Sequence, residues 1–68
     1  MKQTFGKILK DLRLEKGMSQ VELAKNLNVG KSIISVWEKD QAEPKLSNLV
    51  AISQFFGCTI EYLAGMED

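Results

Sequence analysis

The sequence contains no histidine and a single cysteine, Cys58, among its 68 residues. Histidine is the side chain that most often serves as a general base or a metal ligand, so its absence argues against both roles. One cysteine cannot form an internal disulfide, and a four-ligand zinc site without histidine is implausible. We therefore expect no catalytic residues, no metal site and no cofactor, and a protein that is not an enzyme. Cys58 itself is expected to be a small buried apolar group.

Long apolar runs are also missing. No stretch approaches the 18 or more apolar residues of a membrane-spanning helix, and the N-terminus has no apolar signal-peptide core. The lone cysteine is typical of a reducing compartment, so we expect a cytoplasmic protein with no membrane association. One proline and five glycines are compatible with a folded chain, and this length suffices for one small domain, residues 1–68.

Neither sign of charge is in excess, because nine basic residues balance nine acidic ones. The distribution is nevertheless uneven. Residues 1–39 hold eight basic and four acidic residues, whereas residues 40–68 hold one basic and five acidic residues. Such asymmetry is expected of a chain whose first part binds a polyanion, although ordinary solvated helix surfaces would produce it about as often.

The spacing of apolar residues predicts short helices joined by tight turns. Phe5, Ile8, Leu9 and Leu12 recur at helical intervals, which predicts a first helix over residues 4–16 that ends at Lys16-Gly17. Ser19 and Glu22 form the pattern of a capping box at the start of a second helix. We expect that helix to end near Asn28, which tolerates a left-handed turn, and to bury Val21, Leu23 or Ala24, and Leu27.

The remaining chain predicts three more helices. Gly30 can cap a third helix that runs to about Lys39 and buries Ile34 and Trp37, and a loop follows over residues 40–44. A fourth helix is indicated by its apolar residues up to Gly57, which are Leu46, Leu49, Val50, Ile52, Phe55 and Phe56. Thr59 is expected to cap a fifth helix, with Glu61 in its first turn and Ile60 and Leu63 facing inward. No segment alternates like a strand, so the predicted fold class is all-α.

Residues 20–39, QVELAKNLNVGKSIISVWEK, closely resemble the helix-turn-helix of the phage repressor/Cro-like regulators, also called the xenobiotic-response-element family. Ala24 stands where two closely crossing helices need a small residue, and Asn28 stands where the family usually has glycine. Apolar residues occupy the positions that the motif requires, namely Leu23, Leu27, Val29, Ile34 and Trp37. The resemblance implies a lambda repressor-like DNA-binding domain, a compact bundle of five short helices whose third helix enters the major groove.

The same resemblance assigns roles to individual residues. Arg13 and Glu38 occupy positions where many members form an ion pair between the first and third helices. The side chains that would read base edges are Lys31, Ser32, Ser35 and Val36. Those that would contact the DNA backbone are Gln20, Lys39, Gln41 and Lys45.

Two residues of the predicted third helix, Val36 and Ile33, are apolar at positions where a DNA-reading surface is expected to be polar. Val36 replaces the polar residue that most relatives carry, and an exposed valine could pack on a thymine methyl group. Ile33 is a second apolar residue near the start of the helix, and partial burial against a neighbouring helix is an equally good interpretation of it.

These residues predict a sequence-specific DNA-binding transcriptional regulator, a repressor that binds a partly palindromic operator as a homodimer. The dimer contact is expected in the C-terminal helices, whose apolar residues exceed what a small core absorbs: Phe55, Phe56, Ile60, Tyr62, Leu63 and Met66. The alternative is a helical protein-interaction module, antitoxin-like or an anti-regulator, with weak or no DNA binding. The zero net charge and the apolar Ile33 and Val36 favour that alternative.

Overall fold

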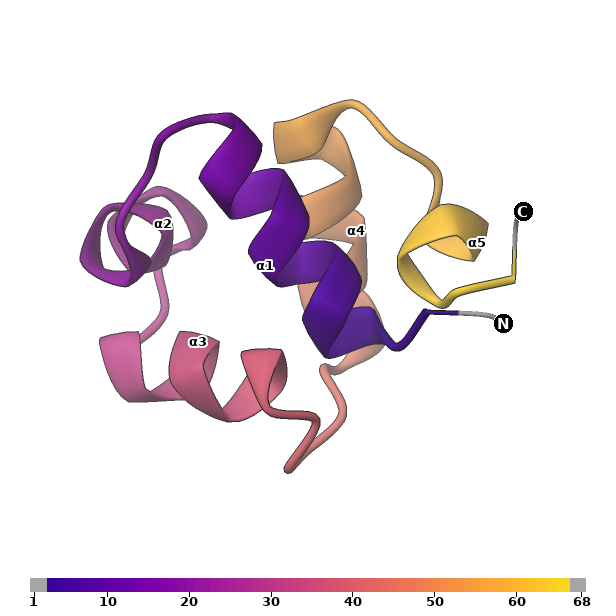
Figure 1. Ribbon diagram of the computed structural model, residues 1–68, viewed down its shortest axis with the longest axis horizontal. Helices are drawn as coiled ribbons and strands as arrows, with labels where there is room; N and C mark the ends of the chain where they lie inside the picture. The colour runs from indigo at the N-terminus through magenta and orange to yellow at the C-terminus, as the bar shows by residue number, and fades with distance from the viewer. Residues whose placement is uncertain (1–2, 67–68) are drawn as a thin grey trace.

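The computed structural model describes residues 3–66, which form five α-helices in the order predicted from the sequence (Figure 1). The helices are α1 (Phe5–Glu15), α2 (Gln20–Leu27), α3 (Lys31–Glu38), α4 (Leu46–Phe56) and α5 (Ile60–Leu63). In Figure 1, α1 runs diagonally through the middle of the molecule, with α2 and α3 on one side and α4 and α5 on the other. The all-α prediction is confirmed.

Local chemistry sets the helix ends. The Thr4 hydroxyl accepts from the Lys7 N–H at 3.2 Å, and the Thr59 hydroxyl accepts from the Tyr62 N–H at 3.0 Å. Asn28 ends α2 in the left-handed conformation with φ 59°, which asparagine adopts more readily than most residues with a side chain. Gly57 ends α4 with φ 70°, a value that favours glycine. The predicted cap at Thr59 and the predicted stops at Asn28 and Gly57 are therefore confirmed, whereas Thr4, predicted as the first residue of a helix, is the N-cap of α1.

Every helix contributes one fully buried side chain to a single core. These residues are Leu9 in α1, Leu23 in α2, Ile34 in α3, Ile52 in α4 and Leu63 in α5. Ile8, Ala24 and Trp37 complete the buried cluster, and the half-buried Cys58 packs against its edge. The core is thus assembled from segments spread over almost the whole chain.

The prediction for Val21 is wrong, because its side chain is 45% exposed while Leu23 and Ala24 are buried. Two residues along an α-helix correspond to a rotation of about 200°, so Val21 and Leu23 lie on nearly opposite sides of α2. Leu27 and Ile60, also expected to face inward, are only partly buried.

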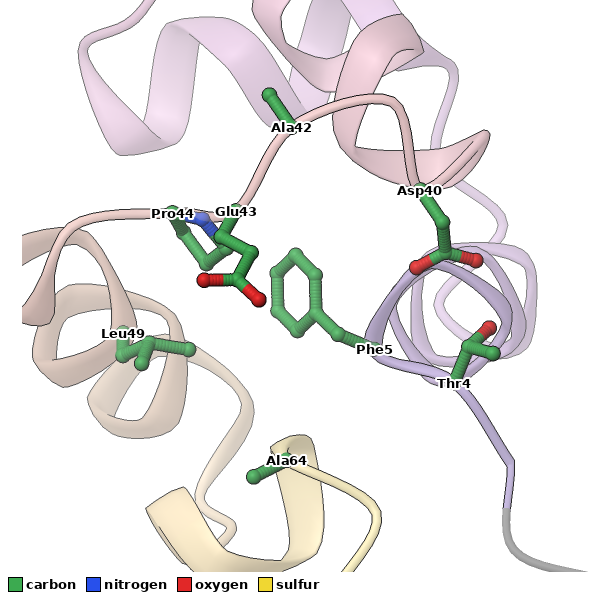
Figure 2. A pocket seen from close by; sticks show the side chains of 8 residues that line it. All are labelled: Thr4, Phe5, Asp40, Ala42, Glu43, Pro44, Leu49 and Ala64. Carbon is green, nitrogen blue, oxygen red and sulfur yellow. The ribbon is translucent and has the colours of Figure 1, made fainter.

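Close contact between the start of α1 and the end of α3 positions α3 in the fold. Asp40 turns the chain after α3 with φ 56°, and its Oδ1 accepts a hydrogen bond from the Gly6 N–H at 2.9 Å. Figure 2 shows the Asp40 carboxylate beside Thr4, over the first turn of α1. A Cβ atom on Gly6 would lie 2.5 Å from the carbonyl oxygen of Trp37, so only glycine allows this approach.

No helix within residues 3–66 has the length and apolar character that crossing a membrane requires.

Candidate nucleic-acid interface

The segment from α2 to α3 forms two helices joined by a three-residue turn. The left-handed Asn28 reverses the chain, and the Val29 N–H donates to the Ala24 carbonyl oxygen at 3.0 Å, which closes the end of α2. Ala24 is 3% exposed, as expected for the small residue at a close helix crossing. Gly30 begins α3 in an extended conformation. The turn therefore fixes the direction in which α3 leaves α2.

One side of α3 is available to a ligand. Ile34 and Trp37 are buried against the rest of the molecule, whereas Lys31 and Ser32 are exposed. Ser35 and Val36, the other two predicted base readers, are half-buried. Val36 is thus less exposed than its sequence position suggested. The chain turns back after α3, and the Gln41 N–H donates to the Val36 carbonyl oxygen at 3.1 Å.

The residues predicted to contact the DNA backbone lie at the two ends of this segment. Gln20 is the first residue of α2 and is partly buried. Lys39 follows α3 directly, Gln41 lies in the loop beyond it, and Lys45 is the N-cap residue of α4; all three are exposed. These side chains thus come from the start of α2, the end of α3, the loop after it and the start of α4.

A buried ion pair joins α1 to the end of α3. Arg13 Nε lies 2.6 Å from Glu38 Oε2, and a second Arg13 nitrogen donates to Glu38 Oε1 at 3.0 Å. The remaining guanidinium nitrogen donates to the Met18 carbonyl oxygen at 2.9 Å. The side chains of the pair are only 9% and 5% exposed. The hydrogen bonds from Arg13 to Glu38 raise the pKa of the guanidinium, which therefore stays charged.

Gln20 is connected to this ion pair. Its amide nitrogen donates to Glu38 Oε1 at 3.1 Å, the same oxygen that Arg13 contacts. One amide hydrogen of Gln20 is thereby engaged inside the protein. The sequence motif placed Gln20 at the start of α2 but carried no signal for this contact, which spans 18 residues.

A pocket of about 390 Å³ opens on the molecule between the start of α1, the loop after α3, α4 and the end of α5. Figure 2 shows the Phe5 ring in its middle, with Glu43 and Pro44 on one side and Asp40 on the other. Two carboxylates in the wall make the pocket unfavourable for a phosphate group. It is therefore a poor candidate for the contact with a nucleic-acid backbone.

The described part of the chain contains no candidate metal-binding cluster. Within residues 3–66, no three histidine, cysteine, aspartate or glutamate side chains come together in a way that could hold an ion.

The sequence analysis missed two residues that build this region. Asp40 caps the first turn of α1 from 34 residues away, and Gly6 permits the close approach of α1 to α3. The only signal in the sequence is a glycine inside the first turn of an otherwise amphipathic helix, which is unusual because glycine disfavours helices.

Comparisons with known proteins agree with this geometry. The model of a family described as helix-turn-helix matches residues 9–63. Among curated proteins, the HTH-type transcriptional regulator ImmR of Bacillus subtilis is 32% identical over 65 residues, covering 96% of this chain and 51% of ImmR. The HTH-type transcriptional activator BcrR of Enterococcus faecalis is 38% identical over 64 residues, covering 94% of this chain and 31% of BcrR. The chain thus spans about half or less of these two relatives.

Two solved structures carry the same fold. The P22 c2 repressor in complex with a synthetic operator superposes with a TM-score of 0.89 at 31% identity, covering 96% of this chain and 98% of that one. The biofilm regulator SinR in complex with DNA gives a TM-score of 0.80 at 31% identity, covering 88% of this chain and 97% of that one.

Proposed function

Because the chain belongs to the helix-turn-helix family of phage repressors and related transcriptional regulators, we propose that it is a sequence-specific double-stranded DNA-binding regulator that represses transcription. The observation that carries this proposal is the α2–turn–α3 unit, which leaves Lys31 and Ser32 exposed at the start of α3 while Ile34 and Trp37 anchor the opposite side. In helix-turn-helix proteins, the N-terminal residues of the second helix contact base edges in the major groove. We propose further that residues 1–68 act as one domain.

The proposed base contacts follow from side-chain chemistry. The Lys31 ammonium group can donate to the O6 and N7 acceptors of guanine, and the hydroxyls of Ser32 and Ser35 can donate or accept. Val36 has no polar atom in its side chain, so its proposed contact is with a thymine methyl group. These contacts would decide which operator is bound.

The proposed phosphate contacts supply affinity without sequence preference. Lys39 and Lys45 would each neutralise a phosphate, and the amide groups of Gln20 and Gln41 would donate to phosphate oxygens. The hydrogen bond from Gln20 to Glu38 limits the rotation of the Gln20 side chain. A donor that is already oriented loses less entropy when it binds.

Salt dependence tests the proposal. The affinity of the protein for a duplex that it selects from a random library should fall as salt rises. A plot of log affinity against log salt concentration should have a slope of about −0.9 per phosphate contacted. Lys39→Ala should weaken binding to all sequences and reduce the steepness of the slope by about one unit. Lys10→Ala, an exposed lysine on α1 outside the proposed interface, is the matched control and should leave the slope unchanged.

The rival function is a protein-interaction module of the same fold. The exposed apolar side chain of Ile33 and the zero net charge favour it. Undetectable binding to duplex DNA at low salt would support this module and overturn the DNA-binding proposal.

Homodimerisation forms part of the proposal. Two α3 helices about 34 Å apart could enter successive major grooves of a partly palindromic operator. The sequence suggested six residues for the contact. Leu63 is fully buried, and Phe55 and Phe56 pack on the core. Tyr62 is 41% exposed and Met66 is 67% exposed. We therefore place the proposed contact at Tyr62 and Met66.

Analytical ultracentrifugation tests the dimer. At micromolar concentration the protein should sediment at twice its 7.6 kDa chain mass, and Tyr62→Asp should shift it toward that mass. Leu14→Asp changes a leucine on α1 that is 55% exposed, and it should have no effect. A single species at the chain mass, with and without operator DNA, would contradict the proposal.

A further inference from the structure

Ile33 presents a branched apolar side chain at the beginning of α3. It is the third residue of the helix and is 41% exposed, whereas its neighbour Ile34 is fully buried. Three residues along an α-helix return to within about 60° of the starting direction, so Ile33 and Val36 lie along one edge of α3. Ile33 is thus partly covered by the protein, and 41% of its surface stays open to a ligand.

The cap of α3 helps to leave Ile33 uncovered. Helical side chains lean toward the N-terminus of their helix, which for Ile33 is the position of Gly30. A Cβ atom on Gly30 would lie 4.0 Å from Ile33 Cγ1 and 3.8 Å from Ser32 Oγ. Because Gly30 has no side chain, the N-cap residue does not cover the side chains of Ile33 and Ser32.

The chemistry of α3 restricts what Ile33 could contact in a major groove. The helix, KSIISVWE, has one cationic side chain, Lys31, and no arginine. Among the groups that base pairs present in this groove, the C5-methyl of thymine is the apolar one. An isoleucine against any other base edge would separate a donor or acceptor from water without replacing its hydrogen bond, which is unfavourable.

We propose that Ile33 is a specificity-determining residue that reads the 5-methyl group of a thymine, so that α3 recognises half-sites in which a methylated pyrimidine lies beside the Lys31 and Ser32 contacts. This inference rests on the proposed function and adds the chemical class of the base. Val36 extends the same apolar edge along α3.

Removal of single methyl groups tests the inference. The probe is a duplex selected by the protein from a random library, in which each thymine is replaced in turn by uracil, a change that deletes only the methyl. At one thymine or more, the wild-type protein should lose about fourfold in affinity, the value expected for one buried carbon group. Ile33→Ala should bind the thymine duplex more weakly than wild type does. Replacing the same thymine by uracil should change the affinity of this variant by less than about twofold.

Leu14→Ala is the matched control, because Leu14 is an exposed apolar residue on α1. This variant should show the full wild-type loss, and circular dichroism should show native helix content in both variants. If the protein selects a duplex but wild type and Ile33→Ala respond equally to every uracil, the inference is overturned while the proposed function stands. If no duplex is selected, the proposed function fails, and the inference fails with it.

Discussion

The contact between Arg13 and Glu38 is a buried, two-hydrogen-bond ion pair between α1 and α3. Arg13→Ala would leave the Glu38 carboxylate buried without its cation, which costs about 3–5 kcal/mol of unfolding free energy. Urea denaturation followed by circular dichroism measures this loss. Lys10→Ala removes an exposed cation from the same helix and should change stability by less than about 0.5 kcal/mol. Equal midpoints for the two variants would contradict the structural role of the pair.

Gly6 provides a second prediction at this scale. Alanine favours helix by about 1 kcal/mol over glycine, so the sequence alone would suggest that Gly6→Ala stabilises α1. The structure predicts the opposite sign, because the new Cβ would lie 2.5 Å and 2.7 Å from the carbonyl oxygens of Trp37 and Glu38. We expect a loss of about 1–3 kcal/mol.

Gly30→Ser is the control for that substitution. Its φ of −75° suits any residue, and the space around it is open to 3.8 Å. Serine is at least as good an N-cap as glycine, so the thermal midpoint should be unchanged or slightly higher. A Gly6→Ala variant with a midpoint above wild type would refute the tight packing of α1 on α3.

The contacts that sequence reasoning missed share one property, which is the long separation of the two partners along the chain. Asp40 and Gly6 are 34 positions apart, and Gln20 and Glu38 are 18 apart. A hydrogen bond of this kind depends on how two helices are packed. The spacing of apolar residues indicates that helices pack together but does not determine such details.

At the scale of elements, the capping box of α2 has a pH-dependent part. Hydrogen bonds from the Ser19 backbone and side chain lower the pKa of Glu22 below its usual 4.5. A carboxyl with a lowered pKa in the folded state contributes stability above its unfolded pKa and loses it as the pH falls through the folded value. The thermal midpoint of wild type should therefore exceed that of Glu22→Gln at pH 7.

The difference between these two proteins should shrink below pH 4.5 and vanish at lower pH, where Glu22 is protonated in both states. Thermal melts of both proteins from pH 7 to pH 3 provide the measurement. A difference that stays constant over this range would exclude the carboxylate as its source.

Helix ends were predicted more accurately than buried faces. A capping residue bonds to backbone groups only three or four positions away. The local sequence therefore suffices to identify the helix ends at Ser19, Asn28 and Thr59. Val21 fits the apolar spacing of a short helix as well as Leu23 does, but only one of the two can face the core. The choice depends on where neighbouring helices lie.

The whole molecule depends on α5 more than its single turn suggests. Leu63 is one of five fully buried core residues, each from a different helix. Leu63→Ala should therefore cost about 2–5 kcal/mol, as much as Leu9→Ala. For a chain of this length, total stability is about 3–10 kcal/mol, so the variant would lose a large share of its free energy of unfolding.

Urea titration of Leu63→Ala should show one cooperative transition at a lower midpoint, and Leu14→Ala, at an exposed position on α1, should match wild type. Loss of only the last turn, with α1 to α4 unfolding at the wild-type midpoint, would contradict a shared core.

The exposed side of α3 could be predicted because the spacing of Ile34 and Trp37 identifies the buried side of an eight-residue helix. The half-burial of Val36 could not be predicted. It accompanies the return of the chain after Asp40, whose left-handed conformation is rare for a residue with a side chain.

A core that takes one side chain from each helix also bears on how the protein forms in the cell. A ribosome releases the chain from its N-terminus, so Leu9, Leu23, Ile34 and Ile52 emerge before Leu63. Until that last residue leaves the exit tunnel, the emerging segments have no complete partner surface. The nascent polypeptide must therefore acquire its native structure late, when translation of these residues is essentially finished.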